Sequence, residues 1–124
     1  MAPDFDAAAF ARAWAAAWND HDVEAVLAHF AEDAMFTSPL AEHIVPGCGG
    51  VVAGKAALRH YWTSALARSP ALRFEVTSAF AGVDCLLIGF RNERGIARFE
   101  VLRFRDGLVV EGHGTFPVEG LAGT

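Results

Sequence analysis

Few residues in this sequence could do chemistry, and the clearest is Glu100 in the stretch "IARFEVLRFRDG", residues 96–107. Arg98 lies two positions earlier, so in an extended strand both side chains point to the same face. If Glu100 is buried among apolar groups, loss of water raises its pKa and leaves it able to donate or accept a proton. If it pairs with Arg98, it stays ionised and only anchors the strand. The sequence leaves both alternatives open.

Two further candidates precede Glu100 in the chain. Ser38 ends the stretch "AMFTSP", and its hydroxyl can hydrogen-bond but cannot abstract a proton from carbon unaided, because its own pKa is far above neutrality. His43 lies in the glycine-rich stretch "LAEHIVPGCGGVVA". In a loop that covers a pocket it would be a candidate acid or base, whereas in a mobile loop it is only solvated.

Other kinds of site lack their motifs. No His, Cys, Asp and Glu residues have the spacing of a metal site. The stretch "PGCGG" lacks the preceding strand and the lysine of a phosphate-binding loop, and no Gly-x-Ser-x-Gly nucleophile turn occurs. The sequence therefore predicts neither a bound metal nor a cofactor.

Composition restricts the class of protein. The chain has 124 residues, of which 53% are hydrophobic, including ten Phe and three Trp. We expect a single domain over residues 1–124 that buries a core or lines an apolar cavity. A net charge of -5 argues against nucleic acid as a partner. No apolar run approaches the roughly 20 residues of a membrane span, and no basic signal peptide begins the chain. With Cys48 and Cys85 read as free thiols, we expect a cytoplasmic protein.

Helical periodicity predicts three helices. They cover residues 4–18, 23–31 and 55–69. In the first, Phe10, Trp14 and Trp18 are four positions apart and form one aromatic stripe. Asp22 is placed to cap the second helix, and Pro70 ends the third.

Alternation and turn signals predict one early strand followed by four consecutive antiparallel strands. The predicted strand regions are residues 34–39, 72–82, 84–95, 96–107 and 108–118. Turn sequences "NERG" and "RDG" separate the later strands. Residues 40–53 are predicted to be a loop with no long regular element. Helices on one face of an antiparallel sheet make an α+β fold.

The order of these elements, together with three stretches, resembles the nuclear transport factor 2-like superfamily, and within it SnoaL-like domains and ketosteroid isomerases. The stretches are "WNDHDVEAVLAHFAEDAMF", "GKAALRHYW" and "FEVLRFRDGLVVE". The resemblance implies three N-terminal helices packed on a strongly curved, mostly antiparallel sheet that forms a cone-shaped barrel. It also implies an apolar pocket at the open end and a homodimer through the outer sheet face. Since this fold hosts isomerases, epoxide hydrolases, cyclases, dehydratases and binding modules, it implies less about function.

Two of the three positions that the resemblance implies for a ketosteroid isomerase carry other residues. Ser38 stands where the catalytic base is expected, and Trp14 stands where a hydrogen-bonding tyrosine is expected. An indole donates one N–H and cannot act as an acid. Glu100 matches the third position, an acid directed into the pocket. Steroid isomerisation by that mechanism is therefore disfavoured. Any acid–base step would have to be carried out by Glu100.

With Glu100 facing the pocket, alternation predicts which residues line it. The predicted substrate-binding residues are Trp14, Trp18, Phe30, Phe36, Ser38, Tyr61, Trp62, Leu86, Ile88, Phe90, Arg98, Leu102, Phe104, Gly112 and Phe116. Gly112 and Gly114 are expected to deepen the cavity because they lack side chains. An aromatic pocket with few polar groups favours a flat or lipophilic ligand.

The outer face of the sheet is predicted to be apolar enough for a dimer contact. The residues assigned to it are Leu87, Phe99, Val101 and Val109, with Glu111 and His113 beside them. One possible role of the protein is therefore a dimeric interaction domain.

The predicted function is binding of a small apolar molecule, with Glu100 and His43 as catalytic residues. The reaction would be isomerisation, dehydration or cyclisation of a lipophilic carbonyl compound. The alternative is a module that binds a hydrophobic ligand without converting it, since catalysis usually needs two polar groups acting together.

Overall fold

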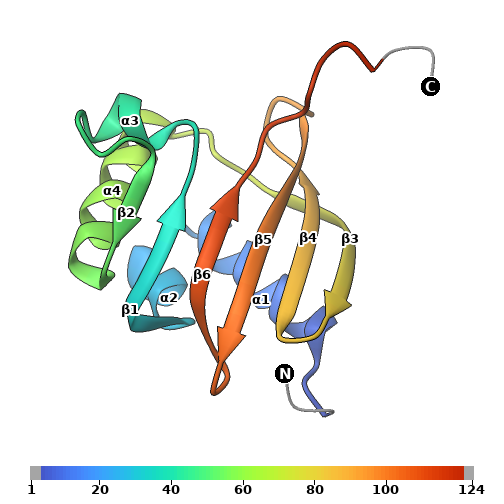
Figure 1. Ribbon diagram of the computed structural model, residues 1–124. Helices are drawn as coiled ribbons and strands as arrows, with labels where there is room; N and C mark the ends of the chain where they lie inside the picture. Colours follow the sequence, from blue (N-terminus) through green and yellow to red (C-terminus); the bar gives the residue numbers. More distant parts are fainter. Residues whose placement is uncertain (1–3, 122–124) are drawn as a thin grey trace.

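The computed structural model describes residues 4–121, which form four helices and six strands (Figure 1). The helices are α1 (Ala7–Asn19), α2 (Val23–Leu27), α3 (Ala41–Ile44) and α4 (Lys55–Arg68). The strands are β1 (Phe30–Thr37), β2 (Val51–Ala53), β3 (Glu75–Gly82), β4 (Cys85–Arg91), β5 (Ala97–Arg105) and β6 (Leu108–Gly114). The α+β prediction is confirmed, with all six strands in one sheet.

The sheet has the order β2-β1-β6-β5-β4-β3. Strand β1 runs parallel to β6, and all other neighbours are antiparallel. The four C-terminal strands follow one another directly, as predicted. The turn between β5 and β6 places Asp106 and Gly107 at φ 53° and 80°, the left-handed conformation that a two-residue hairpin turn requires. Because β6 also pairs with β1, the early strand lies inside the sheet. Only β6 separates it from β5, the strand that carries Glu100.

The first two helices begin where their capping residues are. The side chain of Asp6 accepts a hydrogen bond from the Ala9 N–H at 2.9 Å, and that of Asp22 accepts one from the Ala25 N–H at 3.0 Å. The predicted second helix over residues 23–31 is too long. The chain leaves it after Leu27, because the carbonyl of the following His29 accepts from the Val109 N–H and the chain then enters β1.

Residues 40–53, predicted as a loop, contain two short elements. These are the single-turn helix α3 and the edge strand β2, which pairs with the end of β1. The Glu42 carboxylate accepts hydrogen bonds from the N–H groups of Gly47 and Gly49, which ties the glycine-rich turn to α3. This segment therefore holds a defined shape beside the end of β1.

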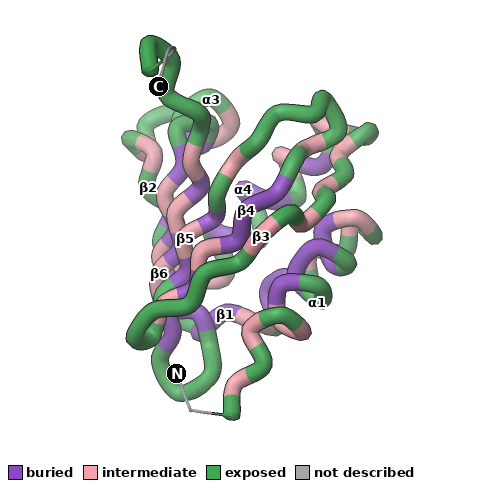
Figure 2. Tube along the Cα trace, turned by 90° about the vertical axis from the view of Figure 1, so that its right-hand side faces the viewer, coloured by how far each residue is buried: buried purple, intermediate pink, exposed green. Residues whose placement is uncertain are grey.

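Helices α1, α2 and α4 cover one face of the curved sheet, and the core lies between them (Figures 1 and 2). Aromatic rings fill it: Trp18 meets Trp62 edge to face at 5.4 Å, and Phe30 meets Trp62 at 5.1 Å. The edge strand β3 remains exposed along most of its length (Figure 2). None of the helices in residues 4–121 is long and apolar enough to cross a membrane.

A β-bulge changes the alternation of β6. The register between β5 and β6 shifts where Phe104 pairs with Val109, and both Val109 and Val110 are buried. The prediction that Val109 lies on the outer face is therefore wrong, since its side chain belongs to the core at 0% exposure. Alternation alone could not reveal this, because one extra residue exchanges the two faces of a strand.

Candidate active site

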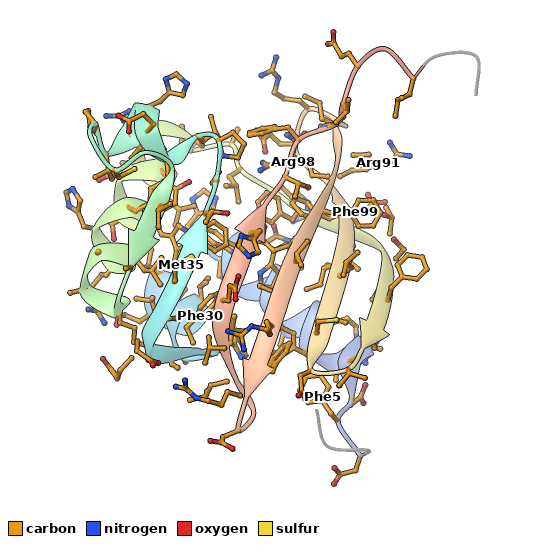
Figure 3. The ribbon with its side chains drawn as sticks, viewed as in Figure 1. Phe5, Phe30, Met35, Arg91, Arg98 and Phe99 are labelled. Atoms are coloured by element: carbon orange, nitrogen blue, oxygen red, sulfur yellow. The ribbon has the colours of Figure 1, made fainter. Side chains whose placement is uncertain are left out.

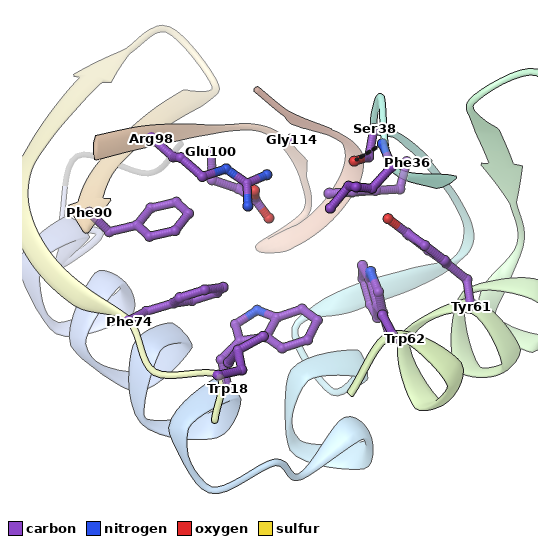
Figure 4. A pocket seen from close by; sticks show the side chains of 13 residues that line it. Trp18, Phe36, Ser38, Tyr61, Trp62, Phe74, Phe90, Arg98, Glu100 and Gly114 are labelled. Carbon is purple, nitrogen blue, oxygen red and sulfur yellow. Dashed lines mark hydrogen bonds between the residues drawn. The ribbon is translucent and has the colours of Figure 1, made fainter. Parts of the chain in front are cut away.

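A cavity opens between the concave face of the sheet and helices α1 and α4 (Figure 4). Its volume is about 90 Å³. The lining residues are Trp18, Phe36, Ser38, Leu40, Tyr61, Trp62, Ala65, Leu72, Phe74, Phe90, Arg98, Glu100 and Gly114. Most of them are aromatic or aliphatic, so each polar group among them has a large influence on what the cavity accepts. We refer to this space as the inner cavity.

Glu100 is the one carboxyl group among the residues that line the inner cavity. It lies in β5 opposite Gly114 of β6 and is 6% exposed. Within residues 4–121 its side chain makes no hydrogen bond. Burial raises the pKa of Glu100 to about 8, although the positive charge of Arg98 acts in the opposite direction. At neutral pH the carboxyl group is therefore mainly protonated and available both as an acid and, after ionisation, as a base.

Arg98 precedes Glu100 on the same face of β5, while Phe99 between them points to the outer face (Figure 3). The Nε–H of Arg98 donates to the Thr115 carbonyl oxygen at 2.8 Å. Its guanidinium carbon lies 4.2 Å from the centre of the Phe116 ring. No ion pair within 4.0 Å joins Arg98 to Glu100 in the described chain. Of the two alternatives that the sequence left open, the geometry favours the poised acid over the direct salt bridge.

Tyr61 and Ser38 supply hydroxyl groups on the opposite side of the cavity (Figure 4). Tyr61 comes from α4 and is 4% exposed, and Ser38 follows the end of β1 and is 5% exposed. The Ser38 hydroxyl accepts a hydrogen bond from the Leu40 N–H at 3.2 Å. Burial raises the pKa of Tyr61. A hydrogen bond with Ser38 lowers this pKa and offsets part of the effect of burial. Tyr61 therefore remains a neutral hydrogen-bond donor at physiological pH.

Two buried indole N–H groups have no hydrogen-bond partner, those of Trp14 and Trp18. Trp18 lines the inner cavity, and its indole nitrogen is directed toward the space between the sheet and the helices (Figure 4). Trp14 lies behind the wall, stacked on Phe74 with ring centres 5.5 Å apart. A buried donor without a partner costs free energy, so the Trp18 N–H would gain from a ligand that accepts a hydrogen bond.

A wider outer chamber of about 420 Å³ continues from the inner cavity. The two spaces share Leu40, Tyr61, Ala65, Leu72, Phe74 and Arg98. His43 of α3 lies here, exposed at the rim. Phe116, beyond the end of β6, also lines the outer chamber. A ligand would therefore pass Arg98 on its way from the outer chamber to Glu100.

The structure brings together part of the predicted set of site residues. Trp18, Phe36, Ser38, Tyr61, Trp62, Phe90, Arg98 and Glu100 line the inner cavity, while Phe116 and His43 line the outer chamber. Seven predicted binding residues line neither space: Trp14, Phe30, Leu86, Ile88, Leu102, Phe104 and Gly112. Six of them lie on strands and Trp14 lies on α1; all seven are buried, and neighbouring side chains fill the space in front of them, so they form the core.

The two glycines of β6 show the difference between cavity and core. A Cβ atom on Gly112 would lie 2.8 Å from the Phe36 ring, so this ring already occupies the space that the missing side chain leaves. A Cβ atom on Gly114 would lie 3.5 Å from Phe36 and from Ser38, at the cavity wall. Gly112 therefore does not deepen the cavity, whereas Gly114 lines it.

Sequence reasoning missed four lining residues: Leu40, Ala65, Leu72 and Phe74. Leu72 and Phe74 belong to the strand predicted over residues 72–82, but β3 begins only at Glu75, so both lie in the loop before it; Leu40 also lies outside the helices and strands. Their shared signal is an apolar residue just outside the end of a regular element. Within residues 4–121 no group of three His, Cys, Asp or Glu side chains is placed to hold a metal ion.

Comparisons with known proteins agree with this architecture. Residues 11–112 match the family described as SnoaL-like domain. A SnoaL-like protein of unknown function from Burkholderia thailandensis is 35% identical, with a TM-score of 0.83, over 90% of this chain and 94% of that one. None of the curated proteins matches the chain.

Two more distant structures are similar in fold alone. TerC, crystallised with polyporic acid, is 18% identical with a TM-score of 0.73, covering 90% of this chain and 92% of that one. A proposed polyketide cyclase from Sinorhizobium meliloti is 15% identical with a TM-score of 0.72, covering 90% of this chain and all of that one, 100%. Both arrange their chain as this protein does.

Proposed function

The chain belongs to the SnoaL-like domain family, and on this premise we propose that it binds a small lipophilic carbonyl compound whose carbonyl end enters the inner cavity and whose apolar body extends into the outer chamber. Glu100 would act there as the acid or base in an isomerisation, dehydration or cyclisation. The observation that carries the proposal is the buried Glu100 carboxyl group, which has no hydrogen-bond partner within residues 4–121 and whose pKa is raised to about 8. Ionisable groups with such displaced pKa values are concentrated at functional sites.

The chemistry follows from the groups around the cavity. The ionised Glu100 takes a proton from the carbon next to a bound carbonyl group, and the electron pair of that C–H bond moves to the carbonyl oxygen as an enolate. Tyr61 and the Trp18 N–H are hydrogen-bond donors that can stabilise this oxygen. The protonated Glu100 then returns the proton to the same or a neighbouring atom.

The second predicted catalytic residue, His43, has a more limited place in this proposal. It lines the outer chamber and not the inner cavity. It would therefore contact only the part of a ligand that extends toward the entrance. Ser38, in contrast, lines the inner cavity and would orient a polar atom of the ligand.

Proton abstraction can be tested without knowing the natural substrate. 2-Tetralone, a small lipophilic ketone, is incubated with the protein in D2O, and deuterium incorporation is followed by mass spectrometry. We expect the wild-type protein to accelerate exchange, with a rate that rises with pH through about 8 because the ionised Glu100 is the base. Glu100→Gln should lower the enzyme-catalysed rate by about 100-fold or more, within the range of general base catalysis.

The matched control for this experiment is Glu75→Gln. Glu75 is an exposed glutamate of the edge strand β3 and lines neither chamber. Its replacement should leave the exchange rate unchanged. Equal rates for the wild type and Glu100→Gln would refute the role assigned to Glu100.

A second candidate function is binding of a hydrophobic ligand without conversion. It is favoured by Ser38, whose hydroxyl cannot act as a base unaided, in the position where the resemblance to ketosteroid isomerases implies a catalytic base, and by Glu100 being the one carboxyl group in the lining. In that case the purified protein should release an unmodified lipophilic compound in native mass spectrometry. Tetralone would then bind without any acceleration of its exchange.

We also propose that two copies pair through the outer face of the sheet. Phe80, Leu87 and Val101 form a row across three strands on this face, and Phe80 is 60% exposed. An exposed apolar row of this kind is typical of a contact surface. Multi-angle light scattering should give twice the mass of the chain, and a monomer at micromolar concentration would contradict the pairing.

A further inference from the structure

The Arg98 guanidinium group lies at the passage between the two chambers and lines both of them. Only its Nε–H has a protein acceptor, the Thr115 carbonyl oxygen. Within residues 4–121 its two terminal nitrogens have neither a hydrogen bond nor an ion pair. The N–H groups of these two nitrogens are therefore available to a ligand.

Within residues 4–121 no ion pair neutralises this charge, although Glu100 and Glu93 act on it over a longer distance. Glu100 is the nearest carboxyl in sequence, but it makes no ion pair with Arg98, and its raised pKa leaves it mainly uncharged at neutral pH. A half-buried cation without a counter-ion is unfavourable, because it has lost part of its hydration and gained no opposite charge. A bound anion would supply the missing partner.

Aromatic rings fix the plane in which such an anion would bind. The Arg98 guanidinium carbon lies 4.2 Å from the centre of the Phe116 ring and 5.8 Å from that of Phe90. These contacts hold the guanidinium group while leaving its terminal nitrogens open. The planar fork of an arginine matches a carboxylate with two parallel hydrogen bonds.

The charges around the outer chamber also favour binding of an anion. Its lining includes three arginines, Arg68, Arg94 and Arg98, against one carboxylate, Glu93. The whole chain nevertheless carries a net charge of -5. A positive entrance on a negative protein attracts anions selectively to this place.

The inner cavity also presents donors to a ligand. The Trp18 N–H has no partner and the Tyr61 hydroxyl is neutral. The protonated Glu100 is a third donor next to Arg98. A ligand that offers oxygen acceptors and negative charge would satisfy these groups, whereas a cation or a pure hydrocarbon would not.

We propose that Arg98 is the anion-binding residue of this cavity and that the ligand is a flat lipophilic carboxylate. Its carboxylate group lies at the passage between the chambers, and its apolar body extends along the shared aromatic wall into the outer chamber, because the inner cavity of about 90 Å³ is too small to hold it alone. The inference rests on the proposed function only in requiring that the cavity binds a small molecule. It names the class of that molecule and does not depend on whether Glu100 transfers a proton.

The test compares two probes that differ in charge and share a shape: 2-naphthoate and 2-naphthamide. Isothermal titration at pH 7 should show 2-naphthoate binding about 10- to 100-fold more tightly to the wild-type protein, the range expected for charged hydrogen bonds. Arg98→Gln should remove this preference while 2-naphthamide binding is retained. Arg98→Lys should keep part of it, since it retains the charge and loses the fork.

The matched control is Arg94→Gln, which removes an exposed positive charge from the outer chamber. The preference for 2-naphthoate should fall by no more than about threefold, as expected for a solvated charge at a greater distance. A preference that survives in Arg98→Gln and disappears in Arg94→Gln would overturn the assignment to Arg98.

A second measurement needs no change at Arg98. Between pH 7 and pH 9.5 Glu100 becomes ionised, and its negative charge should weaken 2-naphthoate binding about tenfold without changing 2-naphthamide binding. Other titratable or charged groups that line the chambers are Tyr61, His43, Glu93, Arg68 and Arg94, and Cys48 interacts with Tyr61 from outside them. Glu100→Gln separates Glu100 from them, because in this variant the pH dependence should disappear.

The outcomes distinguish the two proposals. If both probes bind equally well to the wild type, or if the preference persists in Arg98→Gln, the anion site is refuted while the ligand cavity stands. If neither probe binds, the ligand cavity and the anion site are both refuted. If Arg98→Gln does not fold, the pH dependence of the wild type and of Glu100→Gln decides.

Discussion

Two glutamates on adjacent strands, Glu100 of β5 and Glu111 of β6, lie on opposite faces of one sheet and differ in every contact. Glu111 accepts hydrogen bonds from Arg103 and His113, each at 2.9 Å, and these hydrogen bonds lower its pKa. Glu100 has no such partner within the described chain, and burial raises its pKa to about 8. Each glutamate has an arginine nearby, but only one forms an ion pair. The comparison teaches that partner geometry, more than residue type, separates a structural carboxylate from a reactive one.

The outer face uses its polar residues to connect strands. Thr37 of β1 lies 2.6 Å from His113 of β6, and the chain of hydrogen bonds continues through Glu111 to Arg103 of β5. Three strands are thereby joined by satisfied groups. On the cavity side, in contrast, Trp18 of α1 and Arg98 of β5 keep donors that have no partner within residues 4–121. Unsatisfied groups cost stability, and their concentration on one face is a reason to assign ligand binding to that face.

The largest expected difference between the two glutamates is in the pH dependence of stability. The folded protein holds the Glu100 proton more tightly than the unfolded chain does, so the contribution of Glu100 to stability is fully present below about pH 4.5 and is lost as pH rises to about 8. A shift of this size corresponds to at most about 5 kcal/mol. Glu100→Gln should therefore be more stable than the wild type at pH 8.5. At pH 4.5 the variant should be less stable than the wild type or equally stable. Urea unfolding at both pH values measures these differences.

Glu111→Gln should behave in the opposite sense. The pKa of Glu111 is lowered in the folded state, so its contribution to stability is present above its usual pKa and lost as pH falls through the folded value. The variant should be less stable than the wild type at pH 8.5, with the difference shrinking in acid. If both variants changed the stability at pH 8.5 in the same direction relative to the wild type, the contrast between the two glutamates would be refuted.

A smaller effect is expected at the two glycines of β6. Gly112→Ala places a methyl group against the Phe36 ring and should destabilise the protein by about 1–3 kcal/mol. Gly114→Ala makes only ordinary contacts at the cavity wall, so it should leave stability within about 0.5 kcal/mol and weaken 2-naphthoate binding by narrowing the cavity. Thermal unfolding and titration measure the two effects, and the reverse pattern would show that the wall of the cavity is misplaced.

The smallest effect is expected on the outer face. Thr37→Val removes the hydroxyl group that contacts His113 and should cost about 1 kcal/mol of stability. Probe binding and tetralone exchange should not change, because Thr37 lines neither the inner cavity nor the outer chamber. A loss of exchange in Thr37→Val with unchanged stability would assign a function to the outer face.

Much of this arrangement could be predicted from the sequence where a period or a cap exists. The aromatic stripe of α1 and the alternation in β5 direct Trp18 and Glu100 into the space between the helices and the sheet, and Asp22 marks the start of α2. The predictions fail where tertiary contacts decide. The bulge that buries Val109 depends on pairing between strands. The strand predicted over residues 72–82 begins only at Glu75, so Phe74 lies in the loop before it, where it stacks on Trp14 and separates it from the cavity.

The shape of the cavity was the least predictable feature. Alternation indicates the face to which a side chain points but not whether a neighbour fills the space in front of it. Phe36 fills the space before Gly112, and for this reason the cavity begins only at Gly114. The absence of an ion pair between Arg98 and Glu100 is likewise set by where the Thr115 carbonyl oxygen holds the guanidinium group.

The most direct test of this account is the titration of Glu100 itself. Carbon-13 NMR of glutamate side-chain carboxyl groups, assigned by comparison with Glu100→Gln, reports ionisation of this residue without a substrate. We predict a midpoint near pH 8, with Glu111 titrating below the usual range of a glutamate in the same spectra. A midpoint between pH 4 and 5 for Glu100 would contradict the account, because the carboxyl group would then be an ordinary ionised side chain at neutral pH.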